Sequence, residues 1–130
     1  MPAFQEELMF RTTGDLTVAE TSAALTIYGT SIKGMAARIV VPGSTDLGAA
    51  DTLQAEYHGS ADGSTYHLFA TSEAVAALVA GGEIITPIVC TYKYIKEELI
   101  VSATTTNFGA VVSGLVTGVG FNWDRAVSFE

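Results

Sequence analysis

Apolar and polar residues alternate with a period of two over much of the chain, and the clearest example lies at residues 51–70. Such alternation places one set of side chains on the core face of a β-strand and the other set towards solvent. Between the two halves of this stretch, Asp62 and Gly63 favour a chain reversal, because glycine tolerates positive φ and aspartate can hydrogen-bond its own backbone. The pattern therefore predicts a β-hairpin. Its expected core-facing residues are Leu53, Ala55, Tyr57, Tyr66, Leu68 and Ala70.

Further short segments with strand-like patterns precede and follow this hairpin. Pro42 and Gly43 end one of them. Pro87 in another indicates an edge strand or a bulge, because proline cannot donate to a sheet ladder. Glu97 and Glu98 interrupt the alternation of a third, where a bulge is expected. The predicted strands cover residues 16–20, 24–32, 35–41, 84–90, 92–103 and 110–119, with a loop at 43–50.

One segment, residues 72–82, has the spacing of a short helix instead. Its first residue is a serine, which can cap a helix, and Val75, Leu78 and Val79 would share one helical face. Gly81 can close the end. We therefore expect at most one short helix, covering the sheet.

About eight short strands, with turn signals roughly every 8–12 residues, are typical of an antiparallel β-sandwich or jelly roll. No crossover helices separate the strands, which argues against a parallel α/β fold. A chain of 130 residues suits one all-β domain. We place that domain at residues 15–119, between an N-terminal arm at 1–14 and a C-terminal arm at 120–130.

The two arms carry many large apolar side chains. Residues 120–130 contain the only tryptophan and two of the six phenylalanines. Apolar residues near a chain end need a docking surface on the same chain or on a neighbour, and aromatic side chains are effective interface anchors. The candidate interface residues are Phe4, Leu8, Phe10, Phe121, Trp123 and Phe129.

Charge and composition narrow the choice of partners. The chain has 14 acidic and 6 basic residues, a formal net charge of −8, whereas phosphate binding needs clustered lysine and arginine. Nucleic acid is therefore not expected as a partner. No stretch approaches the ~20 apolar residues of a membrane span, and residues 1–10 do not resemble a secretory signal. The single cysteine, Cys90, excludes an intrachain disulfide and is expected to be a core residue.

Few residues could carry chemistry. His58 and His67 flank the predicted turn and could face each other across the hairpin, but two ligands fall short of the usual four at a structural zinc site. The loop residues Asp46, Asp51 and Asp62 lack the spacing of a calcium loop, so we expect them to form turns.

Glu97 and Glu98 are adjacent, so in a strand they point to opposite faces and cannot work as a paired acid and base. The sequence contains no nucleophile elbow, phosphate-binding glycine loop or His-Glu-x-x-His motif. We expect no enzyme activity and no catalytic, metal-binding or cofactor-binding residues, and therefore no small-molecule substrate.

Three segments together resemble a known family. They are SADGSTY at residues 60–66, similar to a Ser-x-Asp-Gly-x-Thr-aromatic hairpin, ALVAG at residues 77–81, and KYIK at residues 93–96, similar to a Tyr-aliphatic-Arg-Leu strand start. Their order, with the proline-bearing strand around Pro87 between the last two, resembles the capsid-cementing, or decoration, proteins of tailed bacteriophages, typified by small jelly rolls in Bordetella phage. The matched span is residues 34–117. Lys96 stands where arginine is usual, and Glu97 where an apolar residue is expected.

This resemblance implies a structural virion protein that is made in the host bacterial cytoplasm and sits on the capsid exterior. The expected partner is the major capsid protein, whose neighbouring subunits it would bridge as a homotrimer. Acidic charge suits the outer surface of a head better than its DNA-lined interior. Removing residues 1–13 or 121–130 would then be expected to spare the fold and weaken assembly.

Two alternatives remain. The hairpin followed by a Tyr-aliphatic-basic strand also resembles discoidin-type carbohydrate- or surface-binding sandwiches. Those modules place exposed aromatic residues in loops at one end, and here the loops at 43–50 and 104–109 offer only Phe108. A small phage tail or fibre component is the other alternative.

Overall fold

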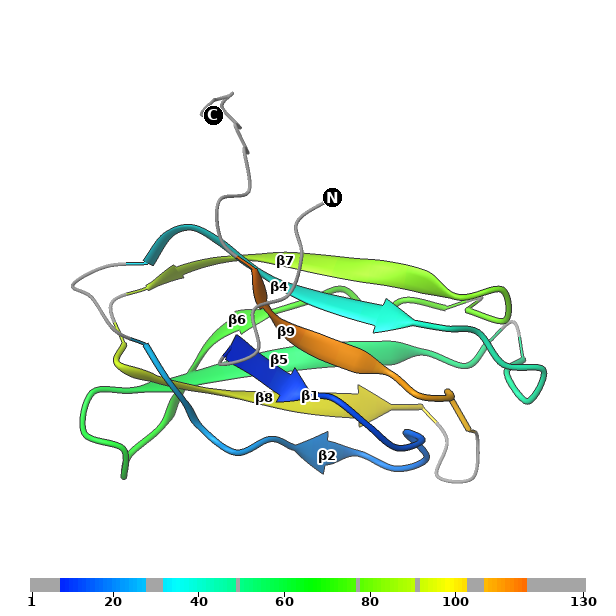
Figure 1. The fold of residues 1–130 in the computed structure, drawn as a ribbon, viewed down its shortest axis with the longest axis horizontal. Helices are drawn as coiled ribbons and strands as arrows, with labels where there is room; N and C mark the ends of the chain where they lie inside the picture. Colours follow the sequence, from blue (N-terminus) through cyan, green and yellow to red (C-terminus); the bar gives the residue numbers. More distant parts are fainter. Residues whose placement is uncertain are drawn as a thin grey trace.

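The computed structural model describes residues 8–27, 32–48, 50–76, 78–90, 92–102 and 107–116, without the side chains of residues 32–34 and 90. This part of the chain forms nine β-strands and no α-helix (Figure 1). The strands are β1 (Met9–Arg11), β2 (Glu20–Thr21), β3 (Leu25–Thr26), β4 (Ile32–Val41), β5 (Leu53–Ser60), β6 (His67–Thr71), β7 (Gly82–Cys90), β8 (Tyr94–Val101) and β9 (Val112–Val116).

The strands pair into two antiparallel sheets. The four-stranded sheet has the order β1-β9-β4-β7, and the five-stranded sheet has the order β2-β8-β5-β6, with β3 also pairing with β8. Strand β5 thus pairs with β6, β4 with β7, β2 and β3 with β8, and β1 with β9. The chain is one long hairpin rolled into two layers, whose long strands follow the long axis of the molecule in Figure 1. This is the connectivity of a jelly roll, and the predicted all-β antiparallel sandwich is confirmed.

The predicted hairpin at residues 51–70 forms the tip of this long hairpin. Leu53, Ala55 and Tyr57 on β5 are fully buried, as the alternation predicted. The turn is held by Asp62, whose Oδ1 accepts hydrogen bonds from the backbone N–H groups of Ser64 at 2.8 Å and Thr65 at 3.1 Å.

The turn needs glycine and an ionised aspartate. Gly63 has a φ of +83°, a conformation that side chains with a Cβ rarely adopt. The hydrogen bonds from the backbone of Ser64 and Thr65 and from the hydroxyl of Ser60 lower the pKa of Asp62 to about 2. Asp62 therefore has the turn-forming role expected from the sequence.

The second half of the hairpin differs from the prediction. Tyr57 pairs with Ala70, but His58 pairs with Leu68, so Phe69 is an extra residue on β6. This bulge reverses the alternation: Phe69 and Ala70 both pack against the core, while Leu68 is 52% exposed. The assignment of Leu68 to the core was wrong, because period-2 counting fails across a bulge.

The described residues between 72 and 82 form no helix, which corrects a second prediction. Val75 forms an isolated bridge with Leu53, in which each N–H donates to the other's carbonyl oxygen at 2.9 Å. Leu78 is buried while Val79 is exposed, so the two residues do not share a buried face. Pairing with the neighbouring sheet has replaced the local helical hydrogen bonds.

Strand β7 lies at the edge of the four-stranded sheet, and this position explains Pro87. The residue pairs with Ala36 of β4 on one side, and no strand of the described residues pairs with β7 on the other. The missing N–H therefore costs no ladder hydrogen bond on the open side. Of the two alternatives predicted for Pro87, an edge strand or a bulge, the edge strand is confirmed.

The N-terminal part of the domain begins earlier than the sequence indicated. Residues Met9–Arg11, which were assigned to an arm, form β1 and pair with β9. Leu16, expected to start a strand, is buried and exchanges backbone hydrogen bonds with Phe108 and Gly109. The expected strand at 24–32 corresponds to β3 and the first residue of β4, with residues 28–31 outside the described part.

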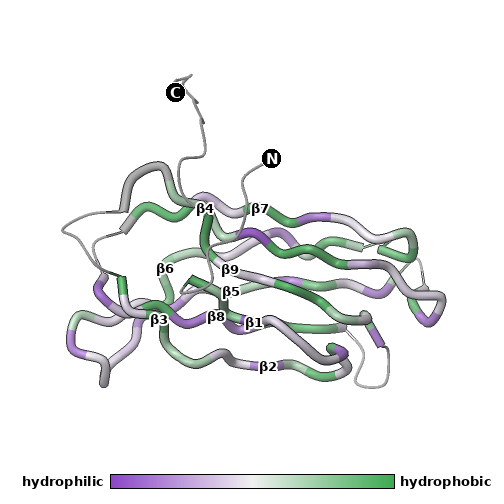
Figure 2. The backbone as a smooth tube through the Cα atoms, in the orientation of Figure 1, coloured by the Kyte–Doolittle hydropathy of each residue, from purple (hydrophilic) through white to green (hydrophobic). Residues whose placement is uncertain are grey.

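The core lies between the two sheets. Figure 2 shows apolar stretches on the strands of both layers and more polar turns at the ends. Phe108, the loop aromatic residue considered for surface binding, is fully buried in this core. The described part of the chain contains no helix long and apolar enough to cross a membrane. The largest fully buried apolar side chains are Tyr57, Phe108, Leu16, Ile39, Leu53, Ile88, Ile95, Leu99, Leu115, Val111 and Val116.

Candidate functional site

The structure places two of the six predicted interface residues inside the domain. Leu8 is buried in the core, and Phe10 packs against it with its ring centroid 6.0 Å from that of Tyr57. The docking surface for these two residues is therefore on the same chain. The other four lie outside the described residues: Phe4, Phe121, Trp123 and Phe129.

A buried carboxyl group lies between the sheets. Glu97, on the inner face of β8, is only 1% exposed. Its Oε1 accepts a hydrogen bond from the Ser113 hydroxyl at 2.6 Å, and its Oε2 accepts one from the Tyr57 hydroxyl at 2.9 Å. Tyr57 belongs to the same sheet as Glu97, but Ser113 is on β9 of the other sheet. The carboxyl group thus links the two layers.

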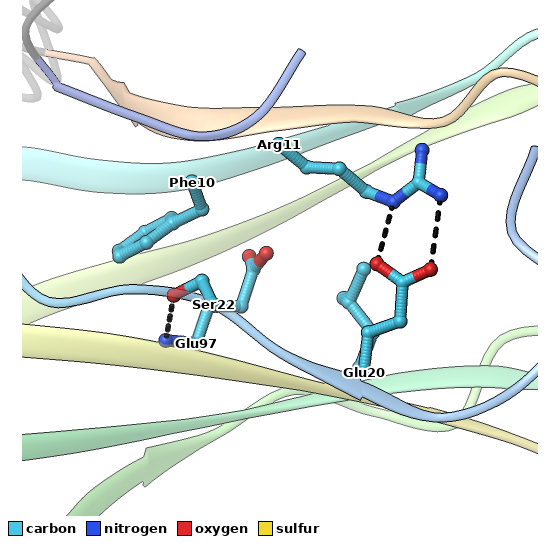
Figure 3. Close-up of a pocket in the computed structure, with 6 residues that line it drawn as sticks. Phe10, Arg11, Glu20, Ser22 and Glu97 are labelled. Atoms are coloured by element: carbon cyan, nitrogen blue, oxygen red, sulfur yellow. Dashed lines mark hydrogen bonds and ion pairs between the residues drawn. The ribbon is translucent and has the colours of Figure 1, made fainter. Parts of the chain in front are cut away.

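An arginine from β1 lies beside this carboxyl group, as Figure 3 shows. Arg11 donates two hydrogen bonds of 3.1 Å to the carboxylate of Glu20 on β2. Phe10, Arg11, Glu20, Ser22, Glu97 and Leu99 surround a cavity of about 20 Å³. That volume holds about one water molecule.

Burial controls the protonation of this group. It raises the pKa of Glu97 to about 7, although the hydrogen bonds from Ser113 and Tyr57 and the positive charge of Arg11 act in the opposite direction. Burial and the negative charge of Glu97 also raise the pKa of Tyr57 well above its ordinary value.

A carboxyl group with a pKa near 7 has the protonation behaviour of a general acid or base. Such a group also needs contact with a substrate, and the space beside Glu97 admits only a water molecule. The arrangement therefore fits a structural polar link between the sheets better than a catalytic centre.

The sequence did not predict this cluster, although the inward position of Glu97 follows from the alternation of its strand. Glu97 and Glu98 were interpreted as a break in the strand, but β5 and β8 pair without a register shift from Leu53–Val101 to Ser60–Tyr94. Ile95, Glu97 and Leu99 simply alternate inwards. The expected bulge was wrong, whereas the expectation that Glu97 and Glu98 face opposite sides is confirmed.

The two histidines do not face each other. His58 pairs with Leu68, and His67 pairs with Gly59. Partner residues point to the same side of a sheet, so the two imidazoles lie on opposite faces of the hairpin. His58 lies instead beside Glu56 and Glu98, with its Nε2 3.8 Å and 3.6 Å from one oxygen of each.

Aromatic rings from two segments meet at the end of the sandwich that carries the β5–β6 turn. Tyr92 lies 6.5 Å from His67 and 5.4 Å from Phe69 between ring centroids. It packs over Gly59, where a Cβ atom would lie 2.2 Å from the Tyr92 ring. Spacing along the sequence could not show this group, because the β7–β8 connection brings Tyr92 to the hairpin.

The outer face of the four-stranded sheet is largely apolar at its β7 edge. Ile85 is 47% exposed and Val89 is 81% exposed, with the exposed Pro87 between them on the same face. One ion pair interrupts the surface, between Arg38 on β4 and Glu83 on β7. We call Ile85, Pro87 and Val89 the β7 patch.

A comparison with protein-family models gives no match, and a search of curated proteins finds no relative with significant sequence similarity. The resemblance to capsid-cementing proteins therefore stays a prediction from the order of three short motifs in the sequence.

Proposed function

We propose that this chain is a structural virion protein that cements the exterior of a tailed-phage capsid by bridging major capsid subunits, acting as a homotrimer. The observation that carries the proposal is the β7 patch. The exposed β-branched and proline side chains on this sheet edge contribute apolar surface. Contact of that surface with water does not stabilise a monomer. An assembly that covers this face would bury that area.

The edge position of β7 adds a second means of association. An edge strand leaves a row of backbone N–H and C=O groups without sheet partners, and another chain can pair with them. Pro87 removes one donor from that row, which limits uncontrolled strand addition. Side-chain packing on the β7 patch is accordingly the main expected mode of contact.

Charge and terminal composition also support an exterior structural role. The net charge of −8 disfavours contact with packaged DNA. The sequence at residues 121–130 also contains three aromatic residues, a residue type that is enriched at interfaces. Both features are general, so they support the proposal only together with the patch and the motif order.

Binding to phage heads tests the proposal. The purified chain should trimerise in light scattering and sediment with assembled heads of the phage that encodes it. Val89→Asp should weaken head binding at least tenfold, because it places a charge in an apolar contact. Leu68→Asp is the control, since Leu68 is also an exposed apolar residue but lies on the five-stranded sheet. A folded protein that ignores heads, or equal losses in both variants, would contradict the proposal.

Truncation offers a separate test of the N-terminal arm. Removing residues 1–13, which was expected to spare the fold, would delete β1 and the buried Leu8. The deletion must therefore stop at residue 7 to preserve the described domain. Loss of head binding after deletion of residues 1–7 or 121–130, with an unchanged melting temperature, is the expected result.

The second candidate function, a carbohydrate- or surface-binding module, is favoured by the rings of Tyr66 and Tyr94, which each lie beside a lysine near the β5–β6 turn. Lys96 places its ammonium 4.3 Å from the centroid of the Tyr66 ring, and Lys93 lies 5.5 Å from that of Tyr94. Partly exposed rings at one end of a sandwich can stack on sugars. A glycan array that shows no specific binding, or binding unaffected by Tyr66→Ala, would remove this candidate.

A further inference from the structure

We propose that Glu56, His58 and Glu98 form a binding site for a divalent cation of the zinc class on the outer face of the five-stranded sheet. One ligand atom from each residue lies within 4.8 Å of the other two. Within the described part of the chain, these three residues form the group of metal-ligating side chains whose ligand atoms lie close enough to share one ion.

The strand register creates the cluster. Glu56 on β5 lies directly opposite Glu98 on β8, so two carboxylates occupy one cross-strand pair. Like charges in such a pair destabilise a sheet. His58 is two residues along β5 and therefore projects from the same face. A bound cation would convert the repulsion between the carboxylates into attraction to a common centre.

The distances fit a metal with short bonds. A tetrahedral ion with bonds of about 2.1 Å holds its ligand atoms roughly 3.4 Å apart. The Nε2 atom of His58 is 3.6 Å from Glu98 Oε1 and 3.8 Å from Glu56 Oε1, so small side-chain rotations suffice. All three side chains are half-buried, which restricts their motion and lowers the cost of ordering them.

The ligand set selects the class of ion. One imidazole and two carboxylates suit zinc and its transition-metal neighbours, whereas calcium prefers six or more oxygen ligands. Three protein ligands leave the fourth position for water, so the site is open rather than a closed structural site. Lys96 is the cross-strand partner of His58, but its ammonium lies over the Tyr66 ring.

Zinc chloride titration of the full chain, without a histidine tag, tests the site. We expect one binding event by calorimetry, a rise in melting temperature, and a shift of the His58 imidazole signals in NMR spectra. His58→Gln should weaken zinc binding by about tenfold or more, and Glu98→Gln should weaken it in the same direction. Calcium chloride should give no comparable response.

His67→Gln is the matched control, because His67 lies on the opposite face of the hairpin and should leave zinc binding unchanged. The proposal is overturned if millimolar zinc gives no response, if calcium binds as tightly as zinc, or if folded His58→Gln binds like the unmodified chain. If His58→Gln does not fold, Glu98→Gln decides the question, since its carboxamide keeps the size of the side chain.

Discussion

The two faces of the β5–β8 strand pair place glutamate side chains in opposite environments. On the inner face, Tyr57 lies opposite Glu97, and a single carboxyl group is enclosed by hydroxyl donors. On the outer face, one residue along each strand, Glu56 lies opposite Glu98, and two half-buried carboxylates lie beside His58.

Desolvation accounts for the difference. Inside, burial penalises the ionised carboxylate and raises the pKa of Glu97 to about 7, so the carboxyl group holds its proton below that pH. Outside, water screens the charges, and their mutual repulsion is small enough to persist in the fold. The carboxyl group of Glu97 therefore joins the two sheets, while those of Glu56 and Glu98 are available to a ligand.

The largest expected effect is on the inner face. Glu97→Ala should lower the free energy of unfolding by about 4 kcal/mol at pH 5, because it leaves a cavity and two buried hydroxyls without their acceptor. Urea denaturation measures the change. Glu98→Ala, one residue along but on the outer face, should change stability by less than about 1 kcal/mol. Equal losses in both variants would show that the two faces do not differ as described.

The pH dependence of stability is the next largest effect. Because the folded-state pKa of Glu97 is raised from 4.5 to about 7, the folded chain binds more protons than the unfolded chain between these values. The contribution of Glu97 is fully present below pH 4.5 and is lost as the pH rises through 7. The expected decrease is about 3 kcal/mol.

Urea denaturation of the unmodified chain and of Glu97→Gln between pH 4.5 and 8.5 measures this decrease, and the glutamine variant should lack it. A pH profile of Glu97→Gln that matches the unmodified chain would contradict the assignment to Glu97.

The lowered pKa of Asp62 affects stability in a different pH range. Its contribution is present above its ordinary pKa of 3.8 and is lost as the pH falls through about 2.

A smaller effect is expected at the link between the sheets. Ser113→Ala should lower the free energy of unfolding by about 1 kcal/mol, since it removes one of the two donors to Glu97. It should also raise the pKa of Glu97 further, which carbon-13 NMR of the carboxyl group can follow. Ser64→Ala, in the exposed turn, should leave both quantities unchanged.

The smallest effect should have the opposite sign. In the presence of a chelator, Glu56→Gln should stabilise the chain by about 0.5 kcal/mol, because it removes a like-charge cross-strand pair. Glu73→Gln, which removes the same charge from an exposed connection, is the control for net charge. A loss of stability in Glu56→Gln would show that the pair is not repulsive.

Much of the fold could be predicted because the relevant signals are local. Alternation along residues 53–57 needs only neighbouring residues to reveal a strand, and the Asp62-Gly63 pair encodes its own turn. Pro87 indicated an edge strand or a bulge for the same reason, since its missing donor is a property of the residue itself. All three predictions are confirmed.

The candidate sites could not be predicted in the same way. Glu56, His58 and Glu98 come from two strands that are joined only by register, and Tyr57, Glu97 and Ser113 come from three. The helical spacing at residues 72–82 was also outweighed by a partner distant in sequence, when Val75 paired with Leu53. Helical preference is worth less than about 1 kcal/mol per residue for most residues, so tertiary contacts can outweigh it.

The sequence by itself thus determined that this chain is an all-β protein built of short strands, because backbone alternation and turn chemistry act over a few residues. Only the tertiary structure decided which side chains meet. The bulge at Phe69 turned Leu68 outwards, and the rolling of one long hairpin brought β9 over β8, so that Ser113 reached Glu97. A carboxyl group becomes buried, or exposed beside another, only when strands far apart in sequence are set in register.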